Sequence, residues 1–209
     1  MPRQPTLVGN TVLLVIDIQA SAFMPPAPEG QGGGIPHVDD YSDRMRRALE
    51  VIEAAREVDM PTVYIQEIHR KNNIDYGREL DGSEGIHCRE DHAGTAMPKE
   101  ITGQRPEDYF VPKRRYSAFF GTDLEILLKG LKAETLIMIG GMTDVCVHYT
   151  FVDGHQHDYH CRVIADSCGG TSEAAHQASL NAMEYLQEGA VLSNEEIIAI
   201  MKDSVKAAA

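Results

Sequence analysis

The chain has 209 residues, of which 43% are hydrophobic, so it can form one compact domain with a substantial core. Its 32 acidic and 19 basic residues give a formal charge of −13, which argues against nucleic acid or an anionic membrane as a partner. No apolar run reaches the roughly 18 to 20 residues that cross a bilayer, and the amino terminus lacks a signal-peptide hydrophobic region. We therefore expect a cytoplasmic protein. Four cysteines without short paired spacing favour reduced thiols over a disulfide framework.

Apolar runs alternate with amphipathic stretches along the chain. Strands are predicted at 11–17, 61–66, 109–113, 134–140, 162–166 and near 190–192, and helices at 39–59, 122–131, 143–157, 172–188 and 194–206. Strands that alternate with helices of this length predict a parallel sheet covered on both faces. We therefore expect a single domain, residues 1–209, with an α/β fold: a three-layer α/β/α, doubly wound, six-stranded parallel sheet.

Two irregular segments, 19–38 and 67–108, follow the carboxyl ends of predicted strands. In open parallel sheets, the loops at that edge border the ligand crevice. We expect these two segments to close a pocket, although long loops can also be plain surface excursions.

Three reactive side chains are predicted to lie at this edge. Asp17 ends an apolar strand, Lys113 ends a short strand, and Cys146 lies in the first turn of the helix after strand 134–140. The helix amino terminus and a nearby ammonium group both favour a thiolate over a thiol. The three groups together suit acyl transfer by a cysteine, with Asp17 moving the proton. Taken singly, they could be a buried apolar cysteine, a turn-capping aspartate and an exposed lysine.

Four segments resemble the isochorismatase-like cysteine hydrolase family, which includes nicotinamidases, N-carbamoylsarcosine amidases, ureidoacrylate amidohydrolases and biuret or triuret hydrolases. The matching residues are Val15 to Gln19 with Phe23, Lys113 to Leu124, Ile139 to Val147, and Val163 to Gly170. The resemblance implies Asp17 as general base and acid, Lys113 as its electrostatic partner and Cys146 as nucleophile. It also implies a cis peptide before Met142, with the N–H groups of Met142 and Cys146 forming the oxyanion hole.

Family members that cleave the vinyl ether of isochorismate lack the cysteine, so the resemblance implies hydrolysis of a C–N bond through a thioester. The expected substrate is a small, polar, linear amide or ureido compound. We expect the enzyme to need no cofactor and to be a homo-oligomer. Two alternatives stay open at this point: a metal-assisted nicotinamidase, and a non-catalytic binding or scaffold protein.

Segment 67–97 bears on the question of a metal. Glu67-Ile-His69 and His87 resemble the metal-binding segments of nicotinamidases, and such a set could ligate zinc. However, Glu67 replaces the expected aspartate, residues 70–73 lack the second histidine of that signature, and the chain has no tryptophan. The segment also resembles metal-free biuret-type hydrolases. The sequence therefore predicts no bound metal, with Phe23, Glu67 and His69 as substrate contacts.

Overall fold

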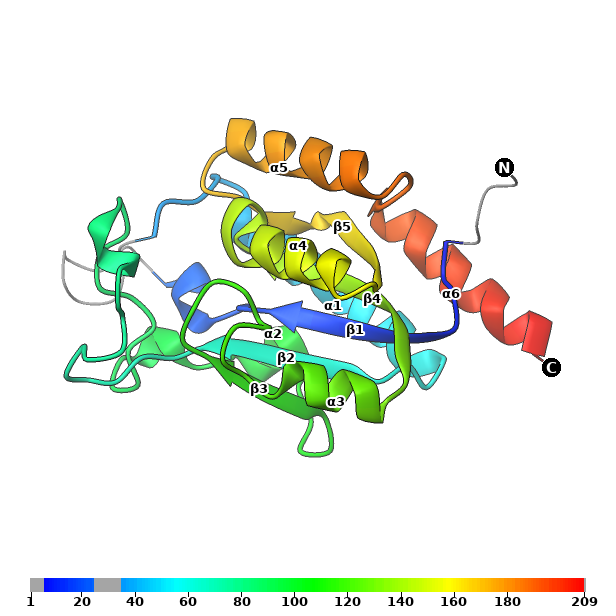
Figure 1. Cartoon of the computed structure of the whole chain (residues 1–209), viewed down its shortest axis with the longest axis horizontal. Coiled ribbons are helices and arrows are strands. Elements are labelled where there is room, and N and C mark those ends of the chain that lie inside the picture. The colour runs from blue at the N-terminus through cyan, green and yellow to red at the C-terminus, as the bar shows by residue number, and fades with distance from the viewer. Residues whose placement is uncertain (1–5, 25–34, 209) are drawn as a thin grey trace.

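The computed structural model describes residues 6–24 and 35–208 (Figure 1). Six strands form one sheet in the order β3-β2-β1-β4-β5-β6, and every neighbouring pair is parallel. They are β1 (Asn10–Ile16), β2 (Thr62–Glu67), β3 (Tyr109–Lys113), β4 (Ala133–Gly141), β5 (His160–Gly169) and β6 (Val191–Leu192). The predicted six-stranded parallel sheet is confirmed.

Helices cover both faces of the sheet (Figure 1). One face packs against α3 (Leu124–Gly130), α4 (His148–Gln156) and α5 (Glu173–Leu186), and the other against α1 (Tyr41–Glu57), α2 (Lys99–Thr102) and α6 (Asn194–Ala208). Short helical turns lie at η1 (Ala20–Phe23), η2 (Glu79–Asp81), η3 (Ala93–Thr95) and η4 (Thr143–Val147). The fold is therefore the predicted three-layer α/β/α arrangement.

The central strand β1 shows why its sequence is apolar without interruption. Val12, Leu14 and Ile16 pack into the core beneath α3 and α4, whereas Leu13 and Val15 pack into the core beneath α1. All five side chains are fully buried. A strand covered on both faces needs apolar residues at every position, because successive side chains point to opposite faces.

The order of the strands reverses between β1 and β4, which are neighbours in the sheet. Gly140, at the end of β4, has a φ of +117°, and a Cβ there would lie 1.9 Å from the carbonyl oxygen of Ile16. Only glycine allows the two strand ends to approach so closely. Ligand crevices in doubly wound sheets open at such a reversal. No helix within the described residues is long and apolar enough to span a membrane.

The helix predicted over 143–157 begins differently from the expectation. Residues Thr143–Val147 form a π-helical turn, in which the Val147 N–H donates to the carbonyl of Met142, and α4 starts only at His148. Thr143 and Asp144, two residue types that commonly cap helices, do not cap this one, because the Thr143 hydroxyl pairs with His176 and the Asp144 carboxylate accepts hydrogen bonds from Thr171. Cys146 therefore lies inside a wide turn, a feature often found at functional sites.

Candidate active site

The three side chains predicted to converge do so. The Lys113 ammonium nitrogen lies 3.3 Å from the Cys146 sulfur and 2.8 Å from Oδ2 of Asp17. Lys113 is fully buried, and the other two side chains line the same pocket. One ammonium group therefore contacts both a carboxylate and a thiol at the carboxyl edge of the sheet.

Backbone geometry at the strand ends sets these positions. Asp17 directly follows β1 in the left-handed region, with a φ of +50°. Its N–H donates to the carbonyl of Ile65, and its Oδ1 accepts the N–H of Glu67 at 2.6 Å. Lys113 is the last residue of β3, next to Glu67 at the end of β2. The carboxylate is thus anchored to the neighbouring strand on one oxygen and to Lys113 on the other.

Glu67 adds a second carboxylate to the cluster. Its Oε2 accepts a short hydrogen bond from the Lys113 ammonium and lies 3.7 Å from the Cys146 sulfur. The side chain is buried and also bonds to histidines on its other oxygen. The sequence predicted Glu67 as a substrate contact; the residue lines the pocket, and its carboxylate also belongs to an internal network of charges.

The charge balance around the sulfur corrects one expectation. Burial raises the pKa of the Cys146 thiol well above its usual value; the Lys113 ammonium opposes this, but Asp17 and Glu67 add to it. Burial likewise raises the pKa of Asp17, against the opposing effect of Lys113. Two carboxylates share one ammonium, so burial and both carboxylates work against the thiolate that Lys113 and the helix terminus alone predict.

The turn after β4 contributes the two residues predicted for the oxyanion hole. The peptide bond between Gly141 and Met142 is cis. Met142 and Cys146 both line the pocket, and each side chain is 7% exposed.

The pocket has a volume of about 860 Å³. Phe23, a predicted substrate contact, lies on its wall together with His87. His69, also predicted as a substrate contact, is fully buried and lies behind Glu67 rather than on the wall described for the pocket. Residues 25–34 of the predicted closing loop lie outside the described part of the chain.

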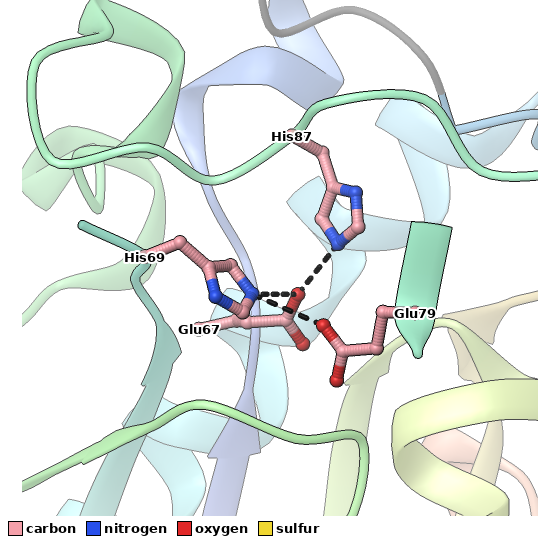
Figure 2. Close-up of side chains that lie close together, drawn as sticks. All are labelled: Glu67, His69, Glu79 and His87. Carbon is pink, nitrogen blue, oxygen red and sulfur yellow. Dashed lines mark hydrogen bonds and ion pairs between the residues drawn. The ribbon is translucent and has the colours of Figure 1, made fainter. Parts of the chain in front are cut away.

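A second cluster adjoins the first and shares Glu67 with it (Figure 2). His87 Nε2 lies 2.8 Å from Glu67 Oε1, and His69 Nε2 lies 3.4 Å from the same oxygen and 3.2 Å from Glu79 Oε2. All four residues are buried, and their ligand-type atoms lie within 4.8 Å of one another. Figure 2 shows both imidazole rings turned toward the carboxylates.

These residues fit a divalent cation. Both carboxylate oxygens of Glu79 are buried and make no hydrogen bond among the described residues beyond the 3.2 Å contact of Oε2 with His69 Nε2. His87 Nδ1 lies 2.7 Å from the carbonyl of Gly85, and His69 Nδ1 lies 3.5 Å from Asp75, so each ring directs Nε2 inward. Metal-binding histidines are oriented by such outer contacts. Two histidines and two carboxylates are a ligand set suited to zinc or another transition metal.

The carboxylates favour protonated imidazoles in this cluster. Burial would lower the pKa of His69, but hydrogen bonding to Glu67 and Glu79 overrides it and raises the pKa to about 9. The pKa of His87 is raised too, because its bond to Glu67 outweighs burial. A cation that binds here must therefore displace the proton of His69.

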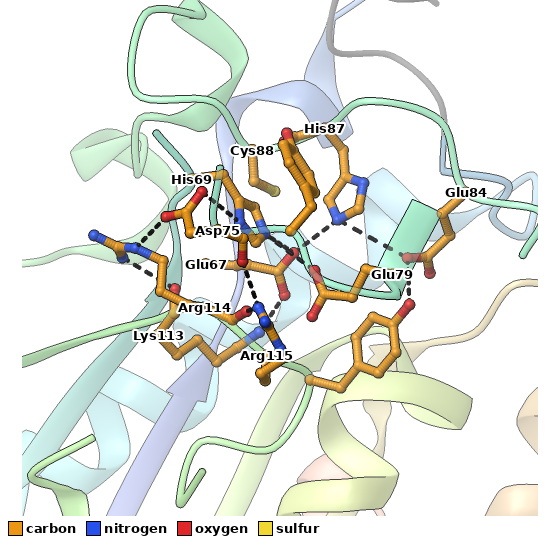
Figure 3. A network of polar contacts seen from close by, with 12 residues as sticks. Glu67, His69, Asp75, Glu79, Glu84, His87, Cys88, Lys113, Arg114 and Arg115 are labelled. Carbon is orange, nitrogen blue, oxygen red and sulfur yellow. Dashed lines mark hydrogen bonds and ion pairs between the residues drawn. The ribbon is translucent and has the colours of Figure 1, made fainter. Parts of the chain in front are cut away.

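Ion pairs fix the loop that carries this cluster (Figure 3). Arg114 Nε lies 3.0 Å from the Asp75 carboxylate, and Arg115 donates to the carbonyl of the same residue at 2.5 Å. The Tyr116 hydroxyl donates to Glu84 at 2.9 Å. The segment that follows Lys113 therefore holds the loop over the pocket.

Sequence reasoning missed several residues of the site. Glu79 lies in a loop without periodicity, and Cys88, which the sequence does not single out, lines the pocket with a φ of +48°. Tyr41 and Arg46 lie on the helix after β1 and also line the pocket. An arginine on the polar face of a helix carries no distinguishing signal in the sequence, whereas the positive φ of Cys88 appears only in the backbone.

Comparisons with known proteins agree with this architecture. The Isochorismatase domain family matches residues 11–196. A ureidoacrylate amidohydrolase, RutB, of Azorhizobium caulinodans is 28% identical over 93% of this chain and 89% of its own length. A probable inactive nicotinamidase of Arabidopsis thaliana is 25% identical over 85% of this chain and 89% of its own length.

Solved structures share the fold. An isochorismatase-like hydrolase of Alkaliphilus metalliredigens is 25% identical, with a TM-score of 0.71 over 91% of this chain and 98% of that one. The pyrazinamidase of Pyrococcus horikoshii in complex with zinc is 24% identical, with a TM-score of 0.72 over 88% and 97% of the two chains. Fold and matched family together define a hydrolase of α/β/α architecture. The chain belongs to the isochorismatase family.

Proposed function

We propose that the protein is a cysteine-dependent amidohydrolase that cleaves the C–N bond of a small, polar, linear amide or ureido compound. The observation that carries the proposal is the contact of buried Lys113 with both Cys146 and Asp17 on the wall of one pocket. A nucleophile beside a proton-accepting group is the arrangement that covalent catalysis needs.

In the first half of the reaction, Asp17 accepts the thiol proton as the Cys146 sulfur attacks the substrate carbonyl. Burial and the two carboxylates favour the protonated thiol, so the proton moves as the sulfur attacks. The N–H groups of Met142 and Cys146 hold the resulting oxyanion. Asp17 then returns the proton to the departing nitrogen, the C–N bond breaks, and ammonia or an amine leaves a thioester.

In the second half, water attacks the thioester carbonyl while Asp17 accepts a proton from it. The C–S bond breaks, the sulfur regains its proton from Asp17, and the acid product is released. Lys113 stays charged throughout, because the carboxylates beside it raise its pKa well above the usual value although burial acts against this. Its charge stabilises the sulfur and the carboxylate in turn.

The relatives support an amide or ureido substrate. The RutB proteins of Azorhizobium caulinodans and Stutzerimonas stutzeri are both named ureidoacrylate amidohydrolases, and the second is 27% identical over 90% of this chain. The intact Cys146, Lys113 and Asp17 argue against a catalytically silent binding protein.

A metal-assisted reaction is the second candidate, favoured by the buried carboxylate of Glu79, whose Oε1 has no hydrogen-bond partner among the described residues. Glu67, His69, Glu79 and His87 would hold the cation. Such a cation would supply Lewis-acid polarisation of a carbonyl next to the pocket. Glu67 and His87 already line that pocket.

The test is ammonia release from a panel of small amides: biuret, triuret, carbamoyl amino acids, ureidoacrylate, maleamate and nicotinamide. Each is measured with native enzyme and with Cys146→Ala, with and without a chelator. We expect release from a linear member of the panel that the variant abolishes. Equal activity of the variant and the native enzyme would reject the proposal, and chelator-sensitive hydrolysis of nicotinamide would favour the second candidate.

A further inference from the structure

The pocket that holds Cys146 has on its wall an arginine without an ion pair. Helix α1 carries four arginines, and three of them, Arg44, Arg47 and Arg56, pair with carboxylates. Arg46 is the exception among the described residues, in a chain with a net charge of −13. An exposed arginine in so acidic a protein, next to a catalytic pocket, is available to an external anion.

Contact with an aromatic ring positions this arginine. The Arg46 guanidinium carbon lies 5.0 Å from the centre of the Phe23 ring, and Phe23 ends the η1 turn on the same pocket wall. Stacking on a ring leaves the edge of the guanidinium free, and that edge offers two parallel N–H donors. Carboxylates are bound by such a fork in a bidentate manner.

The charges around the pocket are divided between its walls. Asp17 and Glu67 come from strand ends, and Glu84 and Asp91 from the loop between β2 and β3, whereas Arg46 comes from α1. Asp17 and Glu67 contact Lys113, and Asp91 pairs with Arg89, so these carboxylates are already compensated. Arg46 is the lining arginine without such a partner among the described residues, so it is the group to which a substrate carboxylate would bind, with the neutral end of the substrate toward Cys146.

A tyrosine hydroxyl is a further polar group on the same pocket wall. Tyr41 is 4% exposed, lines the pocket, and has no hydrogen-bond partner for its hydroxyl among the described residues. A Cβ on Gly141 would lie 1.8 Å from that oxygen, so only glycine leaves room for it. Buried phenol groups nearly always have a hydrogen-bond partner, and here the pocket is where that partner would lie.

We infer that the first turns of α1 form a subsite for a carboxylate on the substrate, with Arg46 as the specificity-determining residue and the Tyr41 hydroxyl as a further hydrogen-bonding group. The substrate class is then an ureido acid or amide acid: a linear molecule with a neutral carbamoyl or amide end and a carboxylate at the other end. This inference rests on the proposed amidohydrolase function and narrows it.

The experiment compares matched pairs of substrates that differ only in charge. N-carbamoyl-β-alanine and maleamate are each assayed beside their methyl esters, and ammonia release gives kcat and KM at low and high ionic strength. We expect the native enzyme to favour each acid over its ester by about tenfold or more in kcat/KM. Added salt should raise KM for the acids more than for the esters, because screening weakens an exposed ion pair.

Four variants test whether the preference for the acids depends on Arg46 and Tyr41. Arg46→Gln should lower the acid-to-ester ratio of kcat/KM about tenfold, chiefly through KM, and Arg46→Lys should restore part of it, because the charge returns without the planar fork. Arg47→Gln, a neighbouring exposed arginine outside the pocket wall, is the matched control. Tyr41→Phe keeps the ring and should lower kcat/KM about tenfold for the acids.

The carboxylate subsite and the amidohydrolase function can be rejected separately. If the native enzyme hydrolyses acid and ester equally and Arg46→Gln leaves their ratio unchanged, the carboxylate subsite is wrong and the amidohydrolase proposal stands. If native enzyme releases ammonia from no member of these pairs or of the wider panel, the proposed function is wrong, and the subsite falls with it. An equal loss in Arg47→Gln and Arg46→Gln would also overturn the subsite, since only the general charge of α1 would then matter.

Discussion

Glu67 and Lys113 form a buried ion pair at the ends of two neighbouring strands. The Glu67 carboxylate belongs to two clusters at once. One oxygen accepts from the Lys113 ammonium beside Cys146, and the other accepts from His87 at 2.8 Å. Burial would raise the pKa of Glu67, but the charge of Lys113 and the histidine bonds hold it well below its usual value. The nucleophile and the histidine cluster are therefore linked through a single carboxylate.

Replacing the nucleophile should abolish turnover without unfolding the protein. Cys146→Ser is expected to lower kcat by at least about 10³-fold, because a hydroxyl in this environment is far harder to deprotonate than a thiol. Steady-state ammonia release measures the loss. Cys88→Ser, on the same pocket wall but outside the contacts of Lys113, is the control and should retain most of the activity. Matching losses in the two variants would contradict the assignment of the nucleophile.

Removing the ammonium group should cost stability as well as activity. Lys113→Met leaves the buried carboxylates of Asp17 and Glu67 without their cation, and breaking such a buried pair costs about 3 to 5 kcal/mol. Urea denaturation measures the free energy of unfolding. The double variant Lys113→Met/Glu67→Gln removes one stranded charge and should recover part of that stability. A double variant less stable than Lys113→Met alone would show that Glu67 is not held by this pair.

The sheet could be predicted from the sequence because its strands are apolar runs that burial on both faces requires. β5 illustrates the limit: the predicted strand 162–166 ends where the apolar residues end, yet the strand continues to Gly169. The extension exists because Cys168 and Gly169 pair with the end of β4 after an irregularity in register. Pairing of that kind depends on the partner strand and leaves no local pattern.

Site residues at strand ends could be predicted from the sequence, whereas site residues in loops could not. Asp17, Lys113 and Cys146 all follow recognisable strands, so topology brings them together. Glu79 reaches the histidines only because the loop is held by contacts such as that of Arg114 with Asp75, which connects distant segments. The charge of the thiol likewise depends on a buried neighbour, Glu67. A homo-oligomeric state and the cytoplasmic location stay predictions.

The pH profile should report the neighbouring carboxylate. Asp17 must be ionised to accept the thiol proton, so kcat/KM should rise as pH rises through its pKa. Burial, and in part the charge of Glu67, raise that pKa above the usual 3.8. Glu67→Gln removes one negative charge and should move the acid limb to lower pH. The profiles are measured in chelator-containing buffer, and a limb that moves upward would reject this role for Glu67.

Metal binding tests the second cluster without relying on activity. Glu79→Gln should weaken zinc binding about 10- to 100-fold, because one of four ligands is lost, whereas Asp81→Asn, in the same helical turn but exposed, should not. Metal content after dialysis and competition with a chromogenic chelator measure the affinity.

The dependence of that affinity on pH has a definite sign. His69, with a pKa of about 9, and His87 must lose their protons to bind a cation, so affinity should increase from pH 6 to pH 8, about tenfold per unit for each proton released. The enthalpy of zinc binding is measured in buffers that differ in their heat of ionisation. The difference between buffers gives the number of protons that binding releases. The stability of the metal-free protein should change with pH in the opposite direction. The stability that protonated His69 confers is present below about pH 6.5 and is lost as pH rises through about 9. Zinc affinity that fell with rising pH, or was equal in Glu79→Gln and native protein, would assign these four residues to a proton-filled structural cluster instead.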